Sequence, residues 1–326
     1  MNTMMQQEAP FAVRRNLPLA HYAGAERRGL GLSRHGNAVN NAKFTQKPMV
    51  TLARFAMRRI DRVASGLAAR MAHSLISSPP RHRPSNAEGL LRASAHQWKI
   101  PFQDGWLQCY RWGTGPQCLF VHCWGGRGTQ PEAMIRQLTQ SGLSVVSFDH
   151  PAHGLSSGKW AEQMRMAQAT AAVIHDVGPI DTLIAHSLGV AATAIALRDY
   201  ELKVRRIVSI SSLTDCTWFI NVIGAYLGIS TQTVAKARAR IDANYAQPVG
   251  WDSLSIPDML AHLKIPMLLV HDRDDHEIPF EHALKIHQTL RHAELIATQG
   301  LGHRRILKDA AVIDQITRFA HEGQAS

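Results

Sequence analysis

The segment 181–189, with the sequence Asp-Thr-Leu-Ile-Ala-His-Ser-Leu-Gly, decides the fold. Its apolar first half is typical of a buried strand, and the alanine-rich residues 190–197 after it are typical of a helix. Ser187 stands at the junction of the two. A serine on a sharp turn between a strand and a helix is the layout of a nucleophile elbow, which presents the hydroxyl at the end of a sheet.

A nucleophilic role for Ser187 requires a base, an acid that orients the base, and donors for an oxyanion, because a serine hydroxyl is a weak nucleophile at neutral pH. The sequence offers an acid at Asp275, after the apolar run 267–271, and a base at His303, in a Gly-Leu-Gly-His turn. A His-Cys-Trp-Gly-Gly turn at residues 122–126 follows another apolar run, and its amides can face a developing oxyanion.

These residues resemble the α/β-hydrolase superfamily over roughly residues 98–319. Landmarks of that family occur in its order along the chain: the turn at 122–126, the Asp-His-Pro-Ala-His-Gly loop within 148–156, the elbow, and the loops around Asp275 and His303. The resemblance implies that Ser187 attacks the substrate and that Asp275 orients His303. Since several ordered landmarks are far more specific than one short motif, we expect an enzyme.

The family pattern also implies finer assignments. The backbone N–H groups of Trp124 and Leu188 would stabilise the oxyanion. The orienting acid stands four residues before a proline, which selects Asp275 over Asp272 and Asp274. Departures from the pattern are Ala185 in place of the first elbow glycine, and Cys123 in place of the glycine that usually follows His122.

Metal binding by His150 and His153 is the alternative reading of the loop at 149–154. No third ligand stands at a convincing spacing, so the sequence predicts no metal site. Hydrolysis through an acyl-enzyme needs no cofactor, and none is expected.

Apolar runs that alternate with helical segments predict an α/β fold, with a mostly parallel sheet covered by helices on both faces. A turn at Asp104-Gly105 predicts that the domain, residues 95–326, opens with an antiparallel pair. The interval 213–262 is too long for one crossover and resembles the helical cap of many α/β hydrolases. Trp124, Trp218 and Phe219 are the predicted substrate contacts, although cap core is the simpler role for the two cap aromatics.

The net charge of +11 belongs to an N-terminal extension. Residues 1–94 hold 15 basic and 4 acidic side chains, whereas residues 95–326 hold 21 of each. Within the extension, which is expected to be partly disordered, Leu52, Phe55, Val63 and further apolar residues to 75 recur among arginines and predict a basic amphipathic helix over 49–77. Such a helix either docks on the hydrolase domain near the cap or lies on an anionic membrane surface. Nucleic acid is not an expected partner.

The four cysteines, Cys109, Cys118, Cys123 and Cys216, show no metal-ligand spacing and are read as reduced thiols of a cytoplasmic protein. No apolar run reaches the 18 residues that a membrane span needs. The arginines at 14 and 15 precede a segment too polar for an export signal.

The sequence therefore predicts a serine hydrolase, similar to carboxylesterases and thioesterases, that cleaves an ester or thioester of a small or acyl-bearing molecule. Two alternatives stay open at this point. One is a non-catalytic protein in which the basic arm binds a membrane or nucleic acid beside a vestigial hydrolase scaffold. The other is a different chemistry on the same fold, such as that of a peptidase, acyltransferase or haloperoxidase. The acyl and leaving-group specificity and the oligomeric state have no signature in the sequence.

Overall fold

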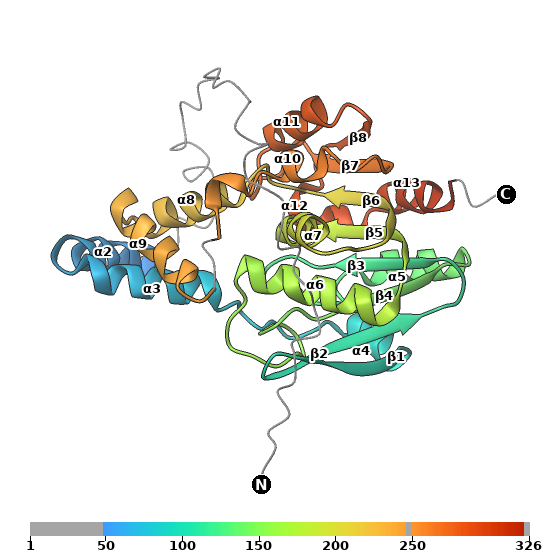
Figure 1. Ribbon diagram of the computed structural model, residues 1–326, viewed down its shortest axis with the longest axis horizontal. Helices are drawn as coiled ribbons and strands as arrows, with labels where there is room; N and C mark the ends of the chain where they lie inside the picture. The colour runs from blue at the N-terminus through green and yellow to red at the C-terminus, as the bar shows by residue number, and fades with distance from the viewer. Residues whose placement is uncertain (1–47, 246–248, 323–326) are drawn as a thin grey trace, which may run out of the picture.

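The computed structural model describes residues 48–245 and 249–322, and within them eight strands form one sheet in the order β1-β2-β4-β3-β5-β6-β7-β8 (Figure 1). The first two strands pair antiparallel, β2 pairs antiparallel with β4, and every later pair is parallel. The strands are β1 (His96–Phe102), β2 (Gly105–Trp112), β3 (Gln117–Val121), β4 (Ser144–Phe148), β5 (Ile180–His186), β6 (Val204–Ile210), β7 (Met267–Asp272) and β8 (Ala293–Thr298). The predicted fold class is confirmed.

Helices cover both faces of this sheet. The longer ones are α2 (Pro48–Val63), α3 (Ser65–Ser77), α4 (Asn86–Ala93), α5 (Glu132–Gln140), α6 (Gln163–Val177), α7 (Leu188–Asp199), α8 (Cys216–Leu227), α9 (Thr231–Asp242), α11 (Glu281–Thr289) and α13 (Ala310–His321). Short elements are η3 (Trp251–Ser253), α10 (Ile256–Leu260), α12 (Gly302–Arg305) and η4 (Ile306–Lys308). No helix in the described ranges combines the length and the apolar character that crossing a bilayer would require.

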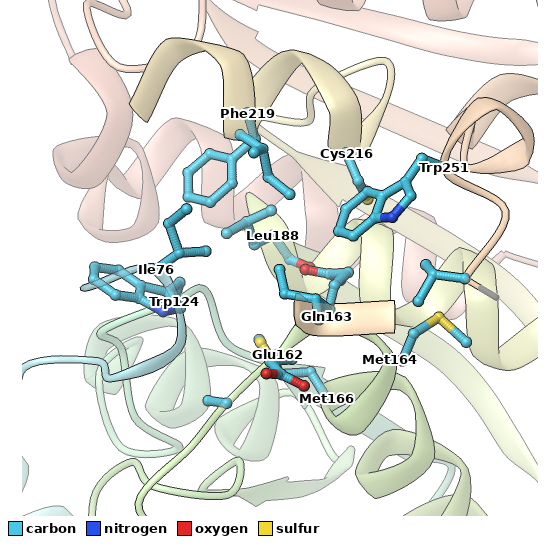
Figure 2. Close-up of a pocket in the computed structure, with 14 residues that line it drawn as sticks. Ile76, Trp124, Glu162, Gln163, Met164, Met166, Leu188, Cys216, Phe219 and Trp251 are labelled. Atoms are coloured by element: carbon cyan, nitrogen blue, oxygen red, sulfur yellow. The ribbon is translucent and has the colours of Figure 1, made fainter. Parts of the chain in front are cut away.

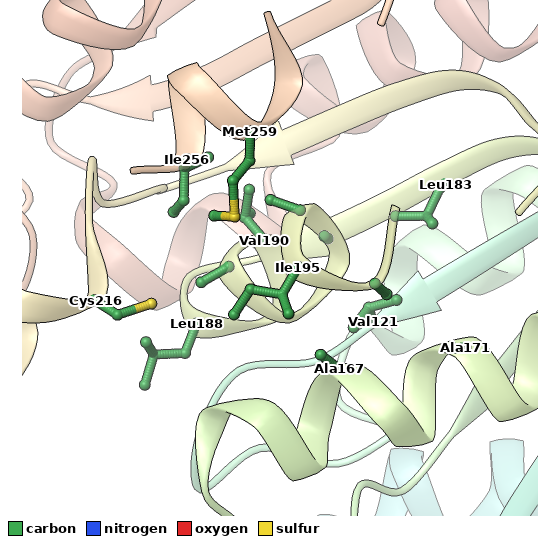
Figure 3. Packing of buried hydrophobic residues seen from close by; sticks show 14 of the residues in the cluster. Val121, Ala167, Ala171, Leu183, Leu188, Val190, Ile195, Cys216, Ile256 and Met259 are labelled. Carbon is green, nitrogen blue, oxygen red and sulfur yellow. The ribbon is translucent and has the colours of Figure 1, made fainter. Parts of the chain in front are cut away.

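Two apolar clusters hold the helices on the sheet, because successive side chains of a strand point to opposite faces. Along β3, Leu119 and Val121 belong to the cluster under α6, α7, α10 and α11, whereas Cys118 and Phe120 belong to the cluster under α4, α5 and α13. Figure 3 shows part of the first cluster, where small alanines of α6 lie under α7. A sheet buried on both faces places the carboxyl ends of its parallel strands at one rim, where sites in such folds form.

The predicted helix over 49–77 is in fact two helices. Ala64, between α2 and α3, has φ −149° and ψ 64°, outside the helical region. The weak helix formers Ser65 and Gly66 follow directly, which favours a break at this point. Both helices pack beside the cap helices α8 and α9, and the four gather beyond the ends of the strands, at the left in Figure 1.

The segment between α3 and β1 is packed on the sheet domain. Ser85 caps α4 by accepting a hydrogen bond from the Glu88 amide, and Trp112 of β2 donates its indole N–H to the Leu91 carbonyl at 2.8 Å. Arg81 donates to four backbone carbonyls of the loop 152–158, at 2.9–3.3 Å. The described part of the extension therefore belongs to the folded body.

Candidate active site

Ser187 occupies the turn between β5 and α7, with φ 57° and ψ −124°. Residues other than glycine seldom adopt a positive φ, and strain of this kind concentrates at functional turns. The turn is held from below, because the Ser187 amide donates to the Ile210 carbonyl at the end of β6 at 2.9 Å. The serine is therefore fixed at the carboxyl rim of the sheet.

Gly189 explains how α7 can start so close to β3. A Cβ at this position would lie 2.5 Å from the carbonyl oxygen of Val121 and 2.7 Å from that of His122. Only glycine lets the helix approach the strand end at that distance. The close approach brings the N-terminus of α7, with Leu188 at its first position, against the turn that contains Trp124.

His303 lies on the short helix α12, after β8, and is buried. Its Nε2 is 3.1 Å from Ser187 Oγ, and its Nδ1 is 2.8 Å from Asp275 Oδ2. Because the Nδ1 proton points to a carboxylate, the imidazole is held in the tautomer whose Nε2 accepts from the serine hydroxyl. The structure thus brings together the three side chains that the sequence singled out. Ser187 and Asp275 are more than 85 residues apart along the chain.

The three acids of the β7–α11 loop have different partners. Asp275 accepts from His303 and from the amides of residues 277 and 278. Asp272 accepts from the amides of residues 274 and 301 and from the Thr298 hydroxyl, and Asp274 accepts from the Gly300 amide. Asp272 and Asp274 therefore organise the loop, and of the three only Asp275 contacts the histidine.

Burial alone would raise the pKa of the Asp275 carboxyl. The hydrogen bond from His303, the charge of that imidazole and the amide of Ile278 outweigh burial and hold the pKa below its ordinary value of 3.8. The carboxylate is consequently ionised at neutral pH, as an orienting group for an imidazolium must be.

Two further histidines support this arrangement, and no local motif marks them. His186 donates from Nε2 to the His303 carbonyl at 2.9 Å, and the two rings lie 4.8 Å apart. His271 donates to the Ile278 carbonyl at 2.9 Å and lies 3.5 Å from Asp275 Oδ2. Burial lowers the pKa of both imidazoles, so both are neutral donors that fix the loops on either side of His303.

The turn after β3 is fixed by histidines as well. His122 Nε2 accepts from the His150 amide at 2.9 Å, and His153 Nε2 accepts from the Gly125 amide at 2.9 Å. The Trp124 amide lies between these anchored positions. Leu188 is the first residue of α7, so its amide has no acceptor within the helix. Both amides stay candidates for binding an oxyanion.

The sequence offered His150 and His153 as possible metal ligands, and we predicted no metal site. Within the described residues, no group of three or more His, Cys, Asp or Glu side chains is arranged to hold a metal ion. His153 instead bonds backbone groups through both ring nitrogens. Burial lowers its pKa to about 3 and that of His122 to about 4, so these rings are neutral.

An apolar pocket lies beside Leu188 and Trp124 (Figure 2). Cap residues Phe219 and Trp251 and the N-terminal residue Ile76 contribute to its walls. The lining residues are Ile76, Trp124, Ala161, Glu162, Gln163, Met164, Met166, Leu188, Cys216, Phe219, Ile220, Ile241, Val249 and Trp251.

Of the predicted substrate contacts, Trp124 and Phe219 line this pocket and Trp218 does not. The Trp218 ring packs edge-on against His282, with 4.3 Å between centroids. The α8 residues that line the pocket are Cys216, Phe219 and Ile220, at the spacing of one helix face, and Trp218 lies on the side of α8 that faces His282.

Glu162 is a pocket residue that no sequence motif singles out. Its carboxylate accepts from His73 at 2.8 Å and Ser77 at 3.3 Å on α3, and from Asn244 at 2.9 Å and Tyr245 at 3.0 Å after α9. These donors are 82–89 residues away in the chain, so no local pattern could reveal them. The buried carboxylate joins the extension, the cap and the start of α6.

Comparison with known proteins places this geometry in a family. A family profile described as "alpha/beta hydrolase fold" matches residues 116–227, and one described as "TAP-like protein" matches residues 242–326. "Alpha/beta hydrolase domain-containing protein 17C" of Xenopus laevis is 22% identical over 279 residues, which cover 76% of this chain and 82% of that protein.

Solved structures agree on the fold. An esterase from Pyrococcus furiosus superposes with a TM-score of 0.56 at 18% identity, covering 74% of this chain and 97% of that one. A bromoperoxidase from Bacillus anthracis superposes with a TM-score of 0.52 at 16% identity, covering 70% and 99%. These superpositions establish a shared fold. The chain belongs to the α/β-hydrolase superfamily.

Proposed function

We propose that this protein is a serine hydrolase that cleaves an ester or thioester bond of an acyl-bearing molecule through a covalent acyl-enzyme. One observation carries the proposal: a single buried imidazole, that of His303, lies 3.1 Å from Ser187 Oγ and 2.8 Å from Asp275 Oδ2. The serine sits at a strained strand-to-helix turn, where its hydroxyl meets a substrate carbonyl at the rim of the sheet.

Acylation follows from these positions. Ser187 Oγ attacks the carbonyl carbon while its proton passes to His303 Nε2, and Asp275 stabilises the resulting imidazolium. The carbonyl oxygen becomes an oxyanion that accepts hydrogen bonds from the Leu188 and Trp124 amides. When the tetrahedral intermediate collapses, the alcohol or thiol leaves with the proton from His303 and the acyl group stays on Ser187.

Deacylation repeats the sequence with water. His303 takes a proton from a water molecule, the oxygen of which attacks the acyl carbon. The second intermediate expels Ser187 Oγ, which recovers its proton from His303, and the acid is released. Bonds and protons balance without a metal or cofactor.

The pocket beside Leu188 and Trp124 suits the acyl group. Its walls are mainly the side chains of Met164, Met166, Phe219 and other apolar residues. Glu162, the one acid in the lining, accepts hydrogen bonds from four donors, so it is not free to act as a base. An apolar acyl chain therefore gains from burial here, whereas a charged acyl group would not.

The decisive experiment combines active-site labelling with a substrate series. A fluorophosphonate probe should label the wild-type protein and not Ser187→Ala, with Ser212→Ala, also at the carboxyl end of a strand, as the matched control. p-Nitrophenyl esters and acyl-CoA thioesters of increasing chain length then define the acyl preference. Absence of labelling, together with no turnover of any ester or thioester in the series, would contradict the proposal.

A further inference from the structure

An apolar stripe on α2 and α3 faces solvent. Its members range from 37% exposed at Met71 to 86% exposed at Val63, although each is large and apolar. They are Leu52, Phe55, Val63, Leu67, Met71 and Leu75. From Val63 onward they recur at every fourth residue, which aligns them along one side. Large apolar side chains exposed in this number on one helix pair are typical of an interaction site.

The helices attach to the protein through a different face. The buried side chains of α3 are small, Ala68, Ala69 and Ala72, together with Ile76 and Ser77 near its end. This alanine face lets α3 lie close to α9. Since packing uses the alanines, the longer side chains of the stripe are left free for another partner.

Arginines border the stripe. Residues 48–77 contain five arginines and one acid. Arg58, Arg59, Arg62 and Arg70 are exposed, and none of them forms an ion pair with an acid in the described part of the chain. The acid, Asp61, is turned inward, where it accepts from Ser230 and Thr233 of the cap.

The same helix pair reaches the pocket. Ile76, which follows Leu75 directly, lines the pocket with Trp124 and Leu188 (Figure 2). His73 and Ser77 fix this end of α3 to Glu162 in the pocket wall. The exposed stripe and the pocket are therefore held in one rigid arrangement.

We propose that the α2–α3 face docks on an anionic lipid bilayer, with the stripe in the acyl region and the arginines among the headgroup phosphates. Charge selects this partner: two copies of so basic a face would repel each other, and a nucleic acid would leave the apolar stripe unmatched. Docking would bring the pocket to the surface from which acyl-bearing substrates come. That last step rests on the proposed function, whereas binding to the bilayer does not.

Vesicle flotation with full-length protein tests the proposal. The Ser187→Ala protein should float with vesicles of phosphatidylglycerol and phosphatidylcholine in equal amounts, not with phosphatidylcholine alone, and binding should weaken with salt. Gln at Arg58, Arg59 and Arg62 together should weaken binding roughly 100-fold, at about one kcal/mol for each arginine. Leu67→Ser with Met71→Ser should abolish it.

Matched controls lie outside α2 and α3. Gln at Arg205, Lys285 and Arg291, and Leu284→Ser, change exposed residues of the same kinds and should bind as the parent does. Thermal melting confirms that each variant is folded, and turnover of p-nitrophenyl acetate by the stripe variants in the wild-type background reads the active site separately.

Several outcomes would overturn the proposal. Flotation that is equal on neutral vesicles, or that survives both sets of substitutions, would place binding elsewhere in the chain. A concentration-dependent dimer that the stripe substitutions dissolve, without vesicle binding, would make a second copy the partner. Failure of the proposed function looks different: vesicle binding would persist while the wild-type protein turned over no ester.

Discussion

The hydroxyl of Ser187 is presented by a backbone conformation that serine does not prefer. A non-glycine residue at positive φ costs on the order of 1–3 kcal/mol, which the surrounding structure must supply. Here the pairing of β5 with β6 and the close packing of α7 on the end of β3 at Gly189 offset this free-energy cost. The neighbourhood is therefore rigid before any substrate arrives.

Replacement of Ser187 by alanine should lower turnover of a p-nitrophenyl ester by about 10⁴–10⁶-fold, because the oxyanion donors and the binding pocket remain but the nucleophile is gone. Alanine is tolerated in the turn nearly as well as serine, so the melting temperature should change little. Steady-state kinetics and thermal melting check both expectations. Turnover within tenfold of wild type would show that another group attacks.

Asparagine at position 275 should reduce kcat about 10⁴-fold, since an amide can present its N–H to His303 and stabilise the wrong tautomer. Asparagine at 272 should act mainly on stability, costing about 1–3 kcal/mol, because an amide group would face three donors. Kinetics at neutral pH and urea denaturation separate the two effects. A greater loss of kcat at 272 or 274 than at 275 would reverse the assignment.

At the scale of elements, strands and catalytic loops were predictable because their signals are local. Apolar runs predicted the strands to within a few residues. The Gly-rich turns at 122–126 and 300–303, which contain Trp124 and His303, predicted where two of these strands end. The rest depends on which surfaces meet. The stripe that includes Leu67 and Met71 left two partners open for this helix, the hydrolase domain and a membrane surface. In the structure α3 packs on α9 through its alanines.

Hydrogen-bond partners that are far apart in the sequence were not predictable either. Glu162 and Arg81 organise several segments through side chains that no periodicity marks. Helix α4 has only eight residues and follows a stretch rich in Pro, Arg and Ser, so the sequence did not predict it. Its stability comes from contacts with β2 and α5, which are visible only in three dimensions.

Packing of α3 can be tested with adjacent residues. Ala72→Leu should destabilise the protein by about 1–3 kcal/mol, because the side chain is fully buried where helices lie close. Met71→Leu, one position away on the exposed stripe, should change stability by less than about 0.5 kcal/mol. Denaturant unfolding measures both. Equal effects would mean that α3 does not pack through its alanine face.

At the scale of the whole molecule, buried neutral histidines set the response to acid. Burial lowers the pKa of His122 to about 4 and of His153 to about 3, and those of His150 and His186 also lie well below 6.5. Between these values and 6.5 the unfolded chain binds protons that the folded protein excludes. The free energy of unfolding therefore falls as pH decreases through this window, by about 1.4 kcal/mol per pH unit for each histidine.

Several such groups together remove several kcal/mol per pH unit, so a protein of ordinary stability should unfold within about two units below pH 6.5. His150→Leu should reduce the slope by about 1.4 kcal/mol per unit without loss at pH 7.5. Neither ring nitrogen of His150 has a hydrogen-bond partner in the described structure. Urea denaturation from pH 7.5 to 5 measures the slopes, with the exposed His292→Gln as control. An unchanged slope in His150→Leu would show that this ring is protonated in the folded state.

The hydrogen bonds of the Arg81 guanidinium constrain how this sequence can evolve. It binds the carbonyls of Ala152, Gly154, Ser156 and Gly158, in the loop whose His153 anchors the turn beside Trp124. A descendant that lost the extension would have to find new donors for these carbonyls or reshape the loop. We therefore expect position 81 and the loop 152–158 to change together among homologous chains. The basic extension, although its composition differs from that of the hydrolase domain, would then have evolved together with the active site.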